Sequence, residues 1–122
     1  MELVPAPSGN WASCIRVIEP ISRKTQYLHE FENNEHTLSL AIVNFEGKDE
    51  TYICVGSIKD YQVHPARNNS VCYITTFLLN EKTSTLELVH KTEVFEIPGA
   101  LTAHKGKLLV TKNKIYELKS NI

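Results

Sequence analysis

The part of the sequence that decides the fold is a turn followed by an apolar block, Gly47-Lys48-Asp49-Glu50 and then Thr51-Tyr52-Ile53-Cys54-Val55-Gly56-Ser57. Gly and Asp tolerate the positive φ angles that tight hairpin turns require. A short, continuous apolar run bounded by a turn is typical of a strand that is buried on both faces. We therefore expect residues 51–57 to form such a strand, entered through a hairpin turn.

Strand-like runs continue on both sides of this stretch. A helix over residues 30–40 is disfavoured, because Asn33-Asn34 interrupts it and a β-branched residue follows. In one of the runs, the spacing of Leu86, Leu88 and Val94 predicts that all three lie on one face. We expect an all-β chain of about eight or nine antiparallel strands, with a turn about every 8–12 residues. The predicted strands cover residues 14–18, 25–31, 37–45, 51–57, 71–79, 86–95, 100–103, 107–111 and 114–118.

Three all-β architectures are compatible with this pattern: a β-sandwich, a closed barrel and the blades of a β-propeller. Apolar blocks that follow Gly- or Asn-bearing turns, each succeeded by a more polar strand, favour blades. A blade takes about 40–45 residues, so the chain would hold roughly two and a half to three of them. The periodicity alone leaves the three architectures open.

Charge and composition restrict the function. The chain has 122 residues, with 13 basic and 14 acidic side chains, whereas a domain that grips nucleic-acid phosphates usually carries a basic excess. No apolar run reaches the roughly 20 residues of a membrane-spanning helix. We therefore expect one globular domain with little or no direct RNA contact and no membrane association.

Residues with catalytic or metal-binding chemistry are present but scattered. The histidines and cysteines are His29, His36, His64, His90, His104, Cys14, Cys54 and Cys72. None has a partner at the short spacing that a zinc site needs, and there is no nucleophile elbow or phosphate-binding Gly-rich loop. We predict no enzyme activity, no cofactor, no metal and no small-molecule substrate. The cysteines should be free thiols in strands, His36 should mark a strand entry, and Trp11 should plug the core or the space between blades.

An ordered series of short motifs resembles one protein family over nearly the whole chain. The series consists of Gly9-Asn10-Trp11-Ala12-Ser13-Cys14-Ile15-Arg16-Val17, Asn34-Glu35, Leu38-Ser39-Leu40-Ala41, Tyr52-Ile53-Cys54-Val55-Gly56, Lys59-Asp60, Pro65-Ala66-Arg67, Leu86-Glu87-Leu88-Val89-His90-Lys91-Thr92, His104-Lys105-Gly106-Lys107-Leu108-Leu109-Val110 and Lys114-Ile115-Tyr116-Glu117-Leu118. It is similar to the third propeller of the large propeller subunits found in splicing factor 3b, in the damage-specific DNA-binding protein and in the cleavage and polyadenylation factor. The motifs that favour the splicing member are Trp11-Ala12-Ser13, Lys59-Asp60 with the loop at Pro65-Ala66-Arg67, and Leu88-Val89-His90-Lys91-Thr92.

The resemblance implies both a fold and a role. Residues 1–122 would form a single partial β-propeller domain of about two and a half to three WD40-like blades. The splicing subunit of this family has three propellers and a helical C-terminal part, lies in the nucleus, and supports a HEAT-repeat subunit in the complex that recognises the branch site. The chain would accordingly be a protein-interaction scaffold. The alternatives are a related adaptor of the DNA-damage ubiquitin-ligase or 3′-end-processing type, and an unrelated small β-sandwich that binds a ligand.

The longest irregular stretch, residues 60–69, is the best candidate for a contact surface. Loops on rigid sheets carry recognition residues, and Tyr and Arg are enriched at interface hot spots. We expect protein contacts from Asp60, Tyr61, His64, Pro65 and Arg67. The alternative is a plain surface loop.

Overall fold

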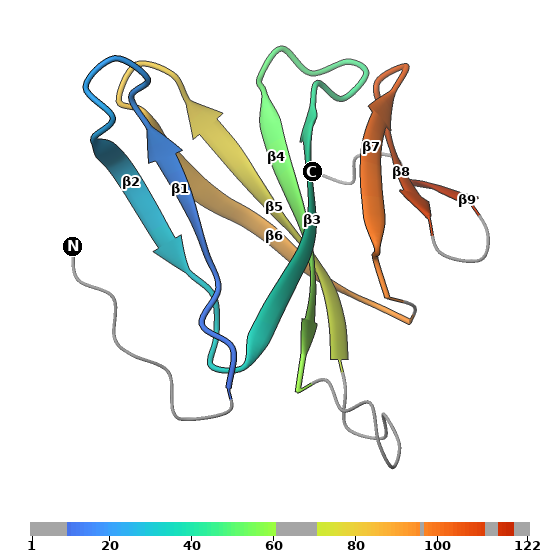
Figure 1. The fold of residues 1–122 in the computed structure, drawn as a ribbon. Coiled ribbons are helices and arrows are strands. Elements are labelled where there is room, and N and C mark those ends of the chain that lie inside the picture. The colour runs from blue at the N-terminus through green and yellow to red at the C-terminus, as the bar shows by residue number, and fades with distance from the viewer. Residues whose placement is uncertain (1–9, 61–70, 96, 112–114, 119–122) are drawn as a thin grey trace.

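The computed structural model describes residues 10–60, 71–95, 97–111 and 115–118, which form strands, turns and short connections (Figure 1). The strands are β1 (Cys14–Ile18), β2 (Thr25–Glu30), β3 (Glu35–Val43), β4 (Tyr52–Lys59), β5 (Val71–Asn80), β6 (Thr85–Val94), β7 (Ala100–His104), β8 (Lys107–Thr111) and β9 (Ile115–Leu118). The predicted strands are confirmed, with ends that differ by at most two residues. No helix that could cross a membrane occurs in the described ranges.

The strands form three antiparallel sheets in which each strand pairs with the next one along the chain. The sheets have the orders β1-β2, β3-β4-β5-β6 and β7-β8-β9. Each sheet is therefore a simple meander built from one continuous stretch of sequence. The antiparallel succession expected from the turn spacing is confirmed.

The four-stranded sheet is the middle layer of the molecule (Figure 1). The β1–β2 sheet packs on one of its faces, with β2 over β6, and β7 and β8 pack on the other face, over β3 and β4. Because both faces are covered, β4 is buried from Tyr52 to Ile58. This confirms the two-sided burial that its continuous apolar run predicts.

Two apolar clusters, one on each face, hold the layers together. Toward β1–β2, the buried residues Ile53, Val55, Phe77 and Leu86 meet half-buried side chains that include Ile15. Toward β7–β8, the cluster contains Val43, Phe45, Cys54, Ile74 and Leu108. Alternate residues of β4 thus contribute to different clusters, as the two-residue period of a strand requires. Each cluster is buried only because side chains from two sheets contribute to it.

A close approach of the backbone explains the glycine in β4. A Cβ atom on Gly56 would lie 2.6 Å from Ser39 Oγ and 2.9 Å from the Pro98 ring. Pro98 is buried in the connection from β6 to β7, and its carbonyl accepts a hydrogen bond from Ser39 Oγ at 2.7 Å. The absence of a side chain at Gly56 therefore leaves room for Pro98, which lies in the connection between the second and third sheets.

Two expectations were wrong. Leu86 lies in the cluster toward β1–β2, whereas Val94 packs in the cluster on the opposite face. Thr76 pairs with His90 and Phe77 with Leu88, so Val89 is an extra residue that reverses the alternation along β6. The core position expected for Trp11 is wrong, because its side chain is 53% exposed, whereas the alternative position between blades stays a prediction.

Candidate functional site

The predicted contact loop connects β4 to β5 at one end of the middle sheet, where the two strands are paired. Its two ends, Lys59 and Val71, are paired residues of β4 and β5. Of the five predicted contact residues, Asp60 is described and exposed. The other four, Tyr61, His64, Pro65 and Arg67, lie outside the described residues.

Asp60 is locked to the turn between β2 and β3. Both Asp60 and Asn34 adopt the left-handed conformation, with φ angles of 58° and 59°. Asn and Asp tolerate this region better than most residues. The backbone N–H of Asp60 donates to the carbonyl of Asn34 at 3.1 Å, and Asn34 Nδ2 donates to Asp60 Oδ1 at 3.2 Å. The loop therefore starts from a fixed backbone position.

A stacked aromatic pair, exposed at Trp11 and half-buried at His36, lies beside this turn. The rings of Trp11 and His36 stack at a centroid distance of 3.8 Å and an interplanar angle of 9°. The Trp11 backbone exchanges hydrogen bonds with Asn34: its N–H donates to Asn34 Oδ1 at 3.1 Å, and its carbonyl accepts from the Asn34 N–H at 3.1 Å. His36 is the second residue of β3, which confirms its expected place at a strand entry.

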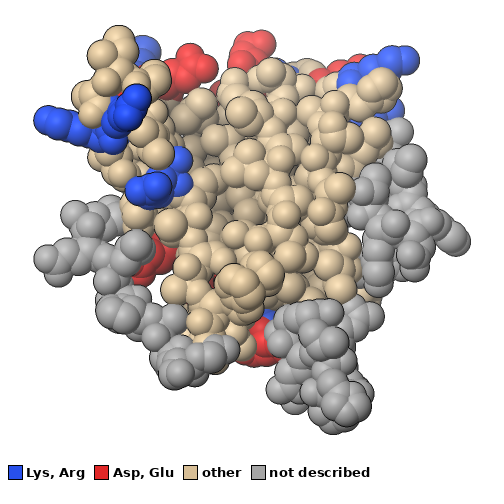
Figure 2. All heavy atoms as spheres, viewed as in Figure 1, with Lys and Arg blue, Asp and Glu red and all other residues tan. Residues whose placement is uncertain are grey.

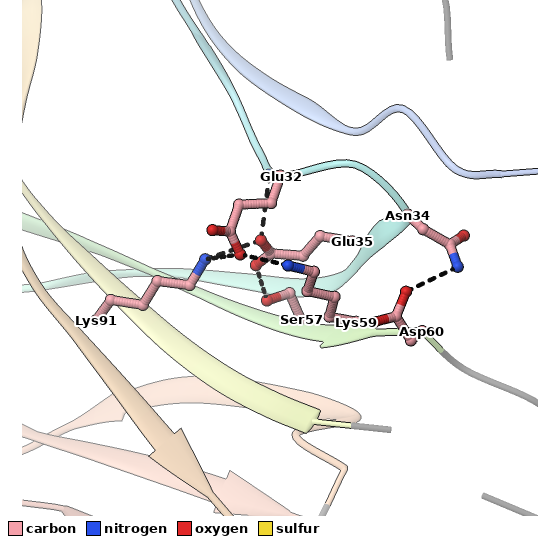
Figure 3. Close-up of polar contacts among 7 residues, drawn as sticks. All are labelled: Glu32, Asn34, Glu35, Ser57, Lys59, Asp60 and Lys91. Carbon is pink, nitrogen blue, oxygen red and sulfur yellow. Dashed lines mark hydrogen bonds and ion pairs between the residues drawn. The ribbon is translucent and has the colours of Figure 1, made fainter. Parts of the chain in front are cut away.

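A cluster of charged side chains lies under the same end of the sheet (Figure 3). Its centre is Glu35, which is fully buried. The Glu35 carboxylate accepts a hydrogen bond from the Ser57 hydroxyl, one from Lys91 Nζ at 2.8 Å, and one from the backbone N–H of Glu32 at 3.3 Å. Lys59 Nζ also binds the Glu32 carboxylate at 3.1 Å. This charge clamp, defined as Glu32, Glu35, Ser57, Lys59 and Lys91, joins the β2–β3 turn to β3, β4 and β6.

Ion pairing within the charge clamp shifts the pKa values of Glu32 and Lys59 in opposite directions. The hydrogen bond from Lys59, aided by the charge of Lys91, holds the pKa of the Glu32 carboxyl below its ordinary value. The hydrogen bond to Glu32 likewise raises the pKa of Lys59. Nearby, burial lowers the pKa of His29, and the positive charge of Lys91 lowers it further. The shifts of Glu32 and Lys59 mark charged groups stabilised by partners, whereas the shift of His29 marks an imidazole whose charged form is disfavoured.

The chemistry of the clamp is structural. The Ser57 hydroxyl is fully buried and donates to a carboxylate that a lysine neutralises, so it does not face a site where a substrate could bind. Cys14, Cys54 and Cys72 form no disulfide, and burial raises the pKa of the Cys54 thiol, which disfavours the reactive thiolate. Within the described ranges, no group of three or more His, Cys, Asp or Glu side chains could hold a metal ion.

Sequence reasoning did not find the charge clamp. Glu35 and Lys91 are 56 positions apart, and each is a single charge inside a strand-like run. Asn34-Glu35, Lys59-Asp60 and the run containing Lys91 do belong to the family-like motifs. The sequence therefore showed that a charged residue stands at a strand position, but it did not show which residue would be its partner.

A second surface feature is an open apolar groove between β1 and β3. Its volume is about 290 Å³, and Cys14, Ile15, Phe31, Leu38, Leu40 and Val55 contribute to its lining. Three apolar side chains of β3 are exposed beside it, namely Leu38 at 36%, Leu40 at 51% and Ile42 at 60%. Large apolar side chains gathered on one strand indicate an interaction surface.

Comparisons with known proteins agree with the motif series. The family model described as the CPSF A subunit region matches residues 12–119. The chain is 40% identical over 119 residues to pre-mRNA-splicing factor RSE1 of Mycosarcoma maydis, covering 94% of this chain and 10% of that protein. It is 39% identical over 105 residues to spliceosome-associated protein 130 A of Arabidopsis thaliana, covering 85% and 9%. It is 37% identical over 114 residues to splicing factor 3B subunit 3 of Danio rerio, covering 93% and 9%.

The chain therefore spans about a tenth of the length of the curated relatives that it matches. The resemblance to the splicing member is confirmed, since all three of these relatives are named as splicing factors or spliceosome-associated proteins. A match over residues 12–119 covers most of the chain. The chain belongs to the CPSF A subunit region family and is homologous to the large splicing-factor subunits within it.

Proposed function

We propose that this chain is a protein-interaction scaffold: a β-propeller segment that supports pre-mRNA splicing in the nucleus by holding protein partners. It acts without catalysis, cofactor or small-molecule substrate. Its partners are protein subunits of a splicing complex, including a HEAT-repeat subunit, and it makes little or no direct contact with RNA. The names of the relatives support the process, and the layered sheets support the mechanical role.

The observation that carries this proposal is the face-to-face succession of sheets. Each sheet is a meander from one stretch of chain, and each buries its apolar face against the next sheet. Radially repeated sheets of this kind are how propellers form. The two-, four- and three-stranded sheets would then be parts of three successive blades of the third propeller, and residues 1–122 one partial propeller domain.

The candidate contact surface is the end of the middle sheet where residues 60–69 leave it. Asp60 is anchored to Asn34, and the stacked Trp11–His36 pair lies beside this turn. Below it, the charge clamp ties β3, β4 and β6 together. We propose that Tyr61, His64, Pro65 and Arg67 contact a protein partner from this rigid base, because ordered scaffolds lower the entropic cost of binding.

Co-purification tests the function. The segment of the M. maydis splicing factor that matches this chain would be replaced by residues 1–122 in a tagged protein, and associated proteins would be identified by mass spectrometry. We expect spliceosomal subunits to be recovered with this chimera. A matched chimera carrying Gly56→Val, which places a side chain against Pro98, should lose them. Recovery of ubiquitin-ligase or 3′-end-processing subunits instead would refute the assignment.

A further inference from the structure

The turn between β1 and β2 exposes an apolar side chain in its middle. Ile21 is 92% exposed, and Ile18, the last residue of β1, is 47% exposed. Single exposed apolar side chains are common on protein surfaces, so exposure alone assigns no role to Ile21. A role follows only from the shape and the charge of the turn around it.

Hydrogen bonds within the turn hold its backbone in one conformation. The Glu19 N–H donates to the Lys24 carbonyl at 3.0 Å, and the Arg23 N–H donates to the Glu19 carbonyl at 2.8 Å. The Glu19 carboxylate accepts from the N–H groups of Ser22 and Ile21. These hydrogen bonds, with Ser22 contributing most, lower the pKa of the Glu19 carboxyl, so it stays ionised at neutral pH and keeps accepting them. A turn that is ordered before binding lowers the entropic cost of docking.

Three basic side chains lie on this turn or beside it. Arg16, Arg23 and Lys24 are exposed, and no described acidic side chain lies within ion-pair distance of them. Figure 2 shows Lys and Arg side chains gathered at the corner of the molecule where Figure 1 places the β1–β2 turn. Glu19 is the one acidic residue between Arg16 and Lys24, and the turn itself occupies its carboxylate. The turn is therefore a basic surface with an apolar centre.

The connection between β3 and β4, at the same end of the molecule, carries the opposite charge (Figure 1). It has three acidic side chains and one basic one over residues 44–51. The charged side chains that line the groove beside it are Asp49, Glu50, Glu81, Lys82 and Glu87. A nucleic-acid strand bound to the basic turn would meet these carboxylates, which repel phosphates. Phosphates also offer no apolar group to Ile21, whereas a polypeptide supplies carboxylates and an apolar residue together.

We propose that the β1–β2 turn is a docking site for an acidic segment of another protein subunit, in which an apolar residue lies between carboxylates. The apolar residue packs on Ile21, and the carboxylates pair with the three basic side chains. The parts of the chain that the structure does not describe contain only Glu2 and Glu96 as acidic residues, so a segment with several carboxylates comes from another chain. This inference rests on the proposed function and names the chemistry of one partner of the scaffold.

The first test uses a synthetic peptide of about 12 residues, made of Asp and Glu with one Leu in the middle, and a control peptide in which Ser replaces the Leu. Each is titrated into the full chain, and the backbone amides are followed by NMR. We expect saturable shifts at Ile21, Ser22 and Arg23. The control peptide should bind about tenfold more weakly, because it loses the apolar contact. Raising the salt from about 50 to about 300 mM should also weaken binding, because exposed charge pairs are screened.

Two matched pairs of surface variants make the test specific. Ile21→Ser should weaken binding of the Leu peptide about tenfold, whereas Phe95→Ser, which removes a fully exposed side chain beyond the end of β6, should leave it unchanged. Lys24→Glu should weaken binding about threefold or more, whereas Lys82→Glu, at an exposed lysine of the β5–β6 turn, should not weaken it. Urea unfolding of each variant checks that the fold is retained.

The second test looks for the partner in the assembled complex. The photoreactive amino acid p-benzoylphenylalanine is placed at position 21 of the chimera with the M. maydis splicing factor. After irradiation of the purified complex, the cross-linked peptides are identified by mass spectrometry. We expect a cross-link to a segment of another subunit in which acidic residues flank an apolar one. A cross-link to a segment without acidic residues, or to the splicing factor's own chain, would overturn the proposal.

Other outcomes of the titrations overturn the proposal as well. Equal binding of the two peptides would remove the role of Ile21. Tighter binding of an oligouridine of about 12 nucleotides than of the Leu peptide, at the same salt, would identify a nucleic-acid site. Shifts at Ile21 that grow with chain concentration and no peptide would identify a second copy as the occupant. If the peptide leaves the turn unchanged while the chimera still recovers spliceosomal subunits, the docking site is wrong and the scaffold function stands.

Discussion

Replacing Lys91 with Met should destabilise the chain by about 3–5 kcal/mol, the usual cost of leaving one partner of a buried ion pair without the other. Glu35 is fully buried, and Lys91 Nζ lies 2.8 Å from its carboxylate. The remaining donors to Glu35, the Ser57 hydroxyl and the Glu32 N–H, are neutral. Met keeps most of the apolar stem of lysine, so the loss comes mainly from charge.

The neighbouring lysine provides the matched control. Lys59 Nζ lies 3.1 Å from Glu32, whose side chain is 57% exposed. Solvent screens this pair, so Lys59→Met should cost less than about 1 kcal/mol. Both substitutions remove one charge from the same cluster. Lys59→Met leaves exposed Glu32 with Lys91 Nζ at 3.7 Å, whereas Lys91→Met leaves buried Glu35 without a lysine.

Urea unfolding followed by circular dichroism measures both costs, with equal m-values confirming that the native states are comparable. The double variant Glu35→Gln with Lys91→Met should recover most of the stability lost on Lys91→Met, because the buried charge is gone. Equal effects of Lys91→Met and Lys59→Met, or no recovery in the double variant, would refute the view that Glu35 is the energetic centre of the clamp.

Three further outcomes are expected. Gly56→Ala should lower the urea midpoint, because the new Cβ would lie under 3 Å from Ser39 and Pro98, whereas Gly47→Ala, with open space around it, should cost only its backbone strain. The free energy of unfolding should fall as the pH drops below about 6.5, because burial lowers the pKa of His29 in the folded chain and the unfolded chain therefore binds its proton first; a His29→Phe variant should show a shallower fall on the same titration. Thiol titration with iodoacetamide should label half-buried Cys14 well before Cys54, whose pKa is raised by burial, and equal labelling rates would contradict the described core.

Strand positions could be predicted from the sequence because strand burial leaves a local signal. Residues 52–56 are apolar without alternation, and they belong to β4, which is buried between two sheets. The reversal in β6 had no such signal, since the extra residue Val89 is itself apolar and fits either face. A bulge depends on pairing across strands, which spacing along one strand does not report.

The candidate site was harder to predict because its residues meet only after the sheets form. The turn of Asn34 and the base of the loop at Asp60 are 26 positions apart, and Glu35 and Lys91 are 56 apart. A single Trp in a sequence also has two opposite interpretations. The large apolar area of its ring favours burial in a core, whereas its indole N–H favours a position at the surface. Trp11 lies on the surface because His36 offers one face for stacking and the Asn34 turn holds its backbone.

The arrangement of the three sheets explains why spacing could not choose between a sandwich and propeller blades. In a sandwich, two sheets share one core and each keeps an outer face in water. Here the middle sheet is apolar on both faces, because Ile53 and Cys54, adjacent in β4, serve opposite clusters. Each flanking sheet meets it with one face only. A chain built this way continues its apolar core from one sheet to the next, and no single pair of sheets encloses it. Leu40 and Ile42 of β3, which are 51% and 60% exposed, pair with Val55 and Ile53 of the cluster on the face against which β1–β2 packs.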